Sequence, residues 1–156
     1  MMDSLTLDVM IDIQQPLNRK DYKFFYPITT RWRDNDVYGH VNNVTYYSYF
    51  DTAVNLYLIE EAGLSIRNAP IVGYVVHSNC NYLSSLSYPD KIDIGLRVNK
   101  IGNKSVTYGV GIFKEGVDKV CAYGEFVHVF VNREDNKSVP IPPTIRAALE
   151  RLVITE

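Results

Sequence analysis

Residues 44–62 place the strongest constraint on how this chain can fold. At helical spacing the segment puts large apolar side chains on most of its circumference. One stripe holds Tyr46, Tyr49, Phe50, Ala53, Leu56 and Tyr57, and it is widened by Tyr47, Val54 and Leu58. The opposite side has few polar residues, namely Ser48, Asp51, Thr52 and Asn55. Such a helix must be covered by protein on most sides, and Gly63 is well placed to end it.

The rest of the chain has the patterns of strands. Residues 22–32 are rich in aromatic and β-branched side chains, and Pro27 should place that strand at a sheet edge or a bulge. After Pro70 the spacing changes to every second residue, with short turns between runs. The predicted strands lie within 71–86, 91–99, 105–113 and 120–132. We expect an antiparallel meander, followed by a short helix over residues 144–152.

These elements predict a single α+β domain over residues 1–156, in which one long helix is wrapped by a curled antiparallel sheet of about five strands. With 46% hydrophobic residues the chain can bury a core of ordinary size. One sheet cannot cover so apolar a helix and also protect its own edges. We therefore expect at least a dimer.

Charge and targeting features exclude several classes of partner. The 16 basic and 18 acidic residues nearly balance, so neither nucleic acid nor an anionic membrane is expected as a partner. No apolar run approaches the roughly 18 residues that a membrane span needs, and residues 1–15 do not resemble a signal peptide. Cys80 and Cys121 lie in strand-like runs without paired spacing. We expect reduced thiols in a cytoplasmic protein.

The segment RDNDVYGHVNN, residues 33–43, lies between the first predicted strand and the long helix. The first amides of a helix have no intrahelical partner and carry the positive end of its dipole, so they can stabilise an oxyanion. A carboxylate one loop away, from Asp34 or Asp36, could act on the same carbonyl as a base or a nucleophile. Such a site would need neither a metal nor a cofactor.

From spacing alone, a purely structural role is the favoured interpretation of these residues. Asp34 and Asp36 could form Asx-turns or cap the helix, and Asn42 and Asn43 are common capping residues. His40 could be a base, although a single loop histidine is more often a hydrogen-bonding residue. The three histidines show no metal-ligand spacing.

The stretch TRWRDNDVYGHVNNVTYYSYFDTA strongly resembles the signature of hotdog-fold acyl-CoA thioesterases of the 4-hydroxybenzoyl-CoA thioesterase type. The resemblance covers residues 22–132 and is most specific over residues 34–50. It implies that Asp36 is the catalytic carboxylate and that the backbone amide of Asn43 polarises the thioester carbonyl. The family often has an aromatic residue or histidine where this chain has Asn43, a change that a backbone donor tolerates. It further implies that the loop contacts substrate through Tyr38, Gly39, His40 and Asn42.

The implied substrate is an acyl thioester of coenzyme A or of a carrier protein. Its acyl chain would run along the helix, between the subunits of a homodimer or homotetramer. Exposed cations near the turn at residues 99–105 could bind the nucleotide of coenzyme A, namely Arg97, Lys100 and Lys104. The alternatives are a hotdog-fold dehydratase, for which Asp51 and Glu60 lie on the helix without a histidine, and a non-enzymatic acyl-chain binding protein.

Overall fold

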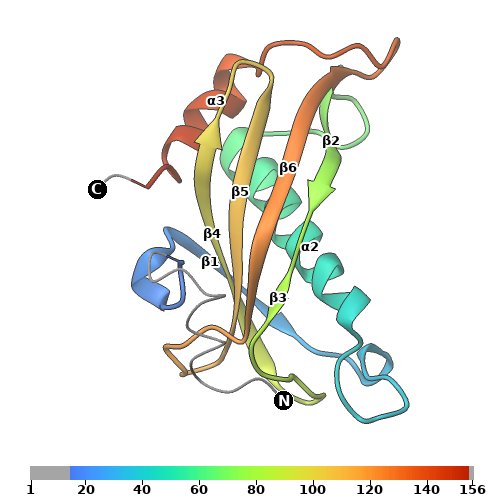
Figure 1. Ribbon diagram of the computed structural model, residues 1–156. Helices are drawn as coiled ribbons and strands as arrows, with labels where there is room; N and C mark the ends of the chain where they lie inside the picture. Colours follow the sequence, from blue (N-terminus) through green and yellow to red (C-terminus); the bar gives the residue numbers. More distant parts are fainter. Residues whose placement is uncertain (1–14, 155–156) are drawn as a thin grey trace.

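The computed structural model describes residues 15–154 of the chain. These residues form two short 3-10 helices, six strands and two α-helices. Their order is η1 (Arg19–Asp21), β1 (Phe24–Thr29), η2 (Trp32–Asp34), α2 (Asn43–Ala62), β2 (Ile71–Ser78), β3 (Asn81–Tyr82), β4 (Lys91–Ile101), β5 (Ser105–Lys114), β6 (Ala122–Asn132) and α3 (Pro143–Glu150). The long helix α2 crosses one face of a twisted sheet, as the predicted hotdog layout requires (Figure 1).

The strands form one antiparallel sheet in the order β1-β4-β5-β6-β2, with the short β3 also paired to β6. The meander of β4, β5 and β6 is confirmed. Within the described residues β1 pairs only with β4, so Pro27 lies on an edge strand, where its missing amide proton costs little.

Two predicted strands are shorter than their sequence patterns indicate. The first ends at Thr29, because the chain turns there: Thr30 donates to the carbonyl of Asp90, and η2 follows. The apolar run after Pro70 breaks into β2 and β3. At that break Gly124 approaches the chain so closely that a Cβ would lie 1.9 Å from the Asn79 carbonyl oxygen.

Helix α2 has well-formed caps at both ends. The side chain of Asn42 accepts a hydrogen bond from the amide of Val44, and Gly63 closes the helix in the left-handed conformation at φ 67°. The helix therefore begins one residue earlier than predicted. Its apolar stripe is buried against the sheet except at Leu56, which is partly buried, whereas Ser48, Asp51 and Thr52 are exposed.

The core lies between α2 and the concave face of the sheet. Alternate residues of the central strands face α2, as predicted from their spacing. They are Ile92, Ile94, Leu96 and Val98 of β4 and Val106, Tyr108, Val110 and Ile112 of β5. At the carboxyl-terminal end of α2, the Tyr57 hydroxyl donates a 2.6 Å hydrogen bond to the Ala148 carbonyl of α3. The opposite, amino-terminal end of α2 receives the loop from β1 (Figure 1).

Candidate active site at the start of the long helix

Residues 34–42, here called the motif loop, fold back on themselves like a small hairpin. The Asn42 amide donates to the Asp34 carbonyl at 2.9 Å, Asn35 and Val41 form an isolated β-bridge, and the Asp36 amide donates to the His40 carbonyl at 2.8 Å. These bonds attach the loop directly to the residue that caps α2. The sequence-predicted juxtaposition of loop and helix start is therefore present.

Asp36 forms the Asx-turn that local patterning favours, yet it remains open to solvent on one side. Its Oδ1 accepts a 2.8 Å hydrogen bond from the Tyr38 amide. No described residue donates to its other carboxylate oxygen, and the side chain lines a surface cavity of about 640 Å³ with Trp32 and Arg33. The carboxylate is thus held in orientation by one oxygen and accessible through the other.

Asp34, the other carboxylate of the motif, has a different environment. It is 2% exposed, and the Tyr49 hydroxyl donates to its Oδ2 at 2.8 Å. Burial alone would raise the pKa of Asp34, but hydrogen bonds from Arg31 and Tyr49 hold that pKa below its usual value. The Arg31 guanidinium lies 3.0 Å from Oδ1. Asp34 is therefore a buried, ionised anchor that caps η2 rather than α2.

The amino-terminal end of α2 has a free donor. Asn43 is the first residue of the helix and is exposed, and no described residue accepts a hydrogen bond from its amide. The amide lies at the positive end of the helix dipole. Asn43 lines a cavity of about 320 Å³ with Val41, Tyr46 and Tyr82, and the Tyr82 hydroxyl donates to the Asn43 carbonyl at 2.9 Å. In the single chain Asp36 and Asn43 line separate cavities.

The tip of the motif loop is strongly exposed. Tyr38 is 84% exposed and Val37 94%, and His40 is also exposed. Gly39 has φ 84°, a conformation that residues with a side chain rarely adopt, and its carbonyl accepts from the Ser87 hydroxyl at 3.0 Å. These residues surround Asp36 with accessible polar and aromatic groups.

The structure separates the three predicted nucleotide-binding cations from the motif loop. Arg97 lies along β4 and is bonded to the Asn99 side chain and the Asp21 carbonyl. Lys100 and Lys104 flank the β4–β5 turn, which α3 contacts through a 2.6 Å bond from Arg146 to Gly102. That turn lies at the α3 end of the molecule, and the motif loop lies at the other end (Figure 1). One chain therefore does not unite these cations with Asp36.

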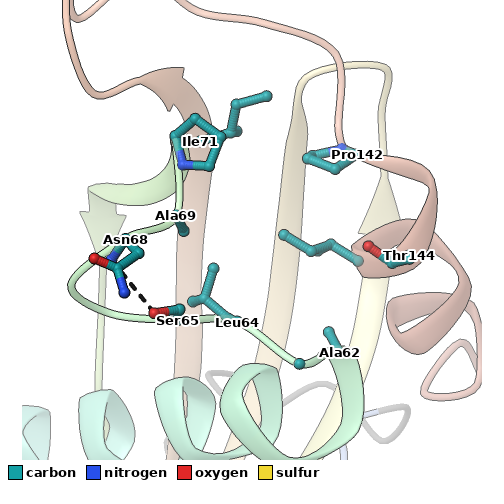
Figure 2. A pocket seen from close by; sticks show the side chains of 11 residues that line it. Ala62, Leu64, Ser65, Asn68, Ala69, Ile71, Pro142 and Thr144 are labelled. Atoms are coloured by element: carbon teal, nitrogen blue, oxygen red, sulfur yellow. Dashed lines mark hydrogen bonds between the residues drawn. The ribbon is translucent and has the colours of Figure 1, made fainter.

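A further cavity, of about 320 Å³, lies between the segment that follows α2 and the start of α3 (Figure 2). Its lining is mostly apolar and includes Leu64, Ile71, Pro142 and Ile145. In Figure 2 the Ser65 hydroxyl accepts a hydrogen bond from the backbone amide of Asn68, with 3.3 Å between Oγ and the amide nitrogen. None of the lining residues has a carboxyl, imidazole, thiol or amino group, and the hydroxyls of the lining belong to Ser65 and Thr144, so the cavity offers no general base.

Sequence reasoning missed three groups that build the site. Tyr49 and Tyr82 have the pattern of ordinary core and strand tyrosines, yet their hydroxyls hold Asp34 and Asn43. Ser87 and its neighbours support the loop from the segment before β4, where the Tyr88 amide donates to Asn35 at 2.9 Å. No spacing in the sequence distinguishes these residues, because their partners lie far away along the chain.

Across residues 15–154, no three His, Cys, Asp or Glu side chains are grouped in a way that could hold a metal ion. No helix among those residues is long and apolar enough to span a membrane.

Comparison with known proteins is consistent with the motif and the fold. The model of the thioesterase-like superfamily matches residues 30–149. The crystal structure of the PA5185 protein from Pseudomonas aeruginosa is similar, with 53% identity, a TM-score of 0.86, and coverage of 88% of this chain and 96% of that one. The BH1999 gentisyl-coenzyme A thioesterase is 25% identical with a TM-score of 0.72, and the match covers 81% of this chain and 99% of that one. YsmA of Bacillus subtilis is 26% identical over 136 residues, which are 86% of this chain and 90% of that protein.

Proposed function

Because this chain belongs to the thioesterase-like superfamily, we propose that it hydrolyses the thioester of an acyl-coenzyme A with Asp36 as catalytic carboxylate and the Asn43 amide as oxyanion donor. The chain is a thioester hydrolase of the hotdog fold.

One observation carries the assignment of Asp36. Its carboxylate is held through Oδ1 by the Tyr38 amide, while the other oxygen has no donor among the described residues and lines an open cavity. The loop that bears it is hydrogen-bonded to Asn42, the residue immediately before the free Asn43 amide. Asp34 cannot take this role, because both of its oxygens are already bonded and it is buried.

The chemistry has two routes. In one, Asp36 attacks the thioester carbonyl carbon, the carbon–sulfur bond breaks, and water cleaves the resulting mixed anhydride. In the other, Asp36 accepts a proton from water as that water attacks the carbonyl carbon. In both, the Asn43 amide and the dipole of α2 stabilise the negative oxygen. Water supplies the oxygen of the free acid, and the sulfur leaves as a thiolate that takes up a proton.

A second subunit would complete the site. Within the described residues β2 pairs only with β6, and its free edge carries Tyr74, Val75 and Val76, which are 45%, 46% and 59% exposed. A homodimer or homotetramer would cover this edge and the exposed side of α2. It could also bring Arg97, Lys100 and Lys104 of one subunit toward the motif loop of another, where they would bind the nucleotide of coenzyme A. In the same complex, Tyr38, Gly39, His40 and Asn42 would contact substrate.

Release of free thiol from a panel of acyl-CoA esters tests the proposal. We expect turnover by the natural chain and a fall in kcat of about 100-fold or more in Asp36→Asn, because the neutral amide is neither a nucleophile nor a base. The fold should be retained, since a single oxygen is replaced at a half-buried loop position. Asp51→Asn is the matched control, because Asp51 is an exposed carboxylate on α2 that would serve a dehydratase. Supplying the same acyl group on a carrier protein identifies the preferred thiol.

Unchanged turnover in Asp36→Asn would remove Asp36 from the reaction. Binding of acyl-CoA without thiol release by the natural chain would support the acyl-chain binding protein instead. Hydration of an enoyl-CoA that is lost in Asp51→Asn would support the dehydratase.

A further inference from the structure

We infer that the hydrogen bond between Tyr49 and Asp34 positions the catalytic loop against the start of α2, so that these two residues are positioning residues for the reaction. The inference rests on the proposed function of Asp36. Neither residue lines the cavity that contains Asp36 or the one that contains Asn43. Their effect on catalysis would therefore be indirect, through the motif loop.

The carboxylate of Asp34 is fully occupied by the chain itself. Its Oδ2 accepts from the Arg31 amide at 2.9 Å and from the Tyr49 hydroxyl at 2.8 Å. Its Oδ1 accepts from Arg31 Nε at 3.2 Å and from Nη2 at 3.0 Å. Three of these four bonds come from Arg31, which is a close neighbour in sequence. Only the Tyr49 bond joins Asp34 to another element of the fold.

The backbone of Asp34 carries this connection into the site. Its carbonyl accepts from the Asn42 amide at 2.9 Å, which closes the base of the motif loop. Asp36 lies two residues after Asp34, and Asn43 follows Asn42. Tyr49 lies in the second turn of α2, so its hydroxyl fixes the base of the loop to the same helix that provides the oxyanion donor. Helix α2 thereby sets the separation between the Asp36 carboxylate and the Asn43 amide.

Water cannot easily replace the hydrogen bond between the Tyr49 hydroxyl and Asp34. Tyr49 is 4% exposed and Asp34 is 2% exposed, so a lost hydroxyl would leave a buried carboxylate oxygen with fewer donors. The three remaining hydrogen bonds to the Asp34 carboxylate all come from Arg31. A shift of about 1 Å in a reacting group can cost about 100-fold in rate. Loss of the Tyr49 hydroxyl should therefore lower kcat. KM should stay nearly constant, because the residues that line the two cavities are unchanged.

Tyr57 provides a matched control on the same helix. It is 1% exposed, and its hydroxyl also donates one buried hydrogen bond, to Ala148 at the other end of α2. Tyr49→Phe and Tyr57→Phe thus remove the same chemical group from the same helix at comparable burial. We would measure kcat, KM and the melting temperature of both variants with an acyl-CoA that the natural chain hydrolyses, and amide hydrogen exchange over residues 34–43.

For Tyr49→Phe we expect kcat to fall about 10-fold or more, KM to change by less than about 3-fold, and exchange in the motif loop to become faster. For Tyr57→Phe we expect a similar drop in melting temperature with kcat within about 2-fold and unchanged exchange in the loop. Equal effects of the two variants on kcat, or none from Tyr49→Phe, would overturn the inference.

The same experiment separates this inference from the proposed function. If Asp36→Asn abolishes turnover while Tyr49→Phe does not change it, the function stands and the positioning role fails. If Asp36→Asn is fully active, the proposed site itself fails. In that case faster amide hydrogen exchange in the motif loop of Tyr49→Phe alone would show that Tyr49 holds the loop, without a consequence for catalysis.

Discussion

The imidazole of His128 packs directly on the backbone of Gly73 in the neighbouring strand. A Cβ at position 73 would lie 2.7 Å from His128 Nδ1, so only glycine leaves room for the ring. The ring is 1% exposed, contacts the rings of Tyr108, Phe126 and Phe130, and has its Nδ1 3.5 Å from the Tyr108 hydroxyl. A titratable side chain is therefore enclosed among aromatic residues, remote from the motif loop.

This enclosure predicts a stability that depends on pH. Burial lowers the pKa of His128 to about 4, whereas an unfolded histidine titrates near pH 6.5. Below pH 6.5 the unfolded state binds more protons than the folded state. The free energy of unfolding is therefore highest above that pH and falls as the pH drops toward 4. We expect the free energy of unfolding in urea to decrease by about 2–3 kcal/mol between pH 7 and pH 4.5.

His128→Phe should remove most of that dependence, because a ring is kept among the same aromatic neighbours and the titrating group is lost. His77→Gln is the control, since His77 is exposed on β2, and it should preserve the natural slope. If the free energy of unfolding changes equally with pH in all three proteins, His128 does not cause the pH dependence.

Loss of the buried carboxylate at position 34 should destabilise the fold. Asp34→Ala leaves the Tyr49 hydroxyl and the Arg31 amide without their acceptor, and we expect a loss of about 2–4 kcal/mol at pH 7. Because the pKa of Asp34 is lowered in the folded state, its contribution is present above an unfolded pKa of about 3.9 and is lost as the pH falls through the folded value. The difference in free energy of unfolding between Asp34→Ala and the natural chain should therefore become smaller below pH 4. Asp118→Ala, at an exposed position between β5 and β6, should change stability by less than about 0.5 kcal/mol.

Two glycines with positive φ allow backbone strain in the loop to be separated from strain elsewhere. Gly39 has φ 84° and Gly63 has φ 67°, and a Cβ at either position would meet no atom within 4 Å. Alanine at either site should cost about 1 kcal/mol of stability through backbone conformation alone. We expect kcat to fall several-fold only in Gly39→Ala, because Gly39 lies in the loop that carries Asp36. Thermal unfolding and thiol release measured on both variants test this, and equal kcat values would contradict it.

The exposed edge of β2 should be a subunit contact. Val76 is 59% exposed and lies at the register shift between Val75 and His77, so Val76→Lys adds a charge to that edge without disturbing the core. In sedimentation velocity we expect the natural chain to be at least a dimer and Val76→Lys to shift toward monomer. Val117→Lys, at a 43% exposed position in the β5–β6 turn, should leave the assembly unchanged. A monomeric natural chain would exclude the subunit contact.

The parts of this protein that depend on local spacing can be predicted from the amino-acid sequence. The 3.6-residue period over α2 and the two-residue period along β4 and β5 place side chains relative to their own backbone, and Gly63 permits the left-handed conformation that ends α2. The motif likewise indicated a loop that leads into a helix start. Such features are encoded within a few residues, so they were readable without the fold.

Which polar groups meet depends on how the elements pack in three dimensions. The tertiary structure divided the two carboxylates of the motif into a buried anchor at Asp34 and an accessible group at Asp36, it joined Tyr49 and Tyr82 to the site, and it moved Lys104 to the opposite end of the molecule. The physical reason is that a hydrogen bond across 15 or 39 residues depends on how the helix and strands pack together. Side-chain periodicity does not contain that information, because the same pattern is compatible with several strand orders.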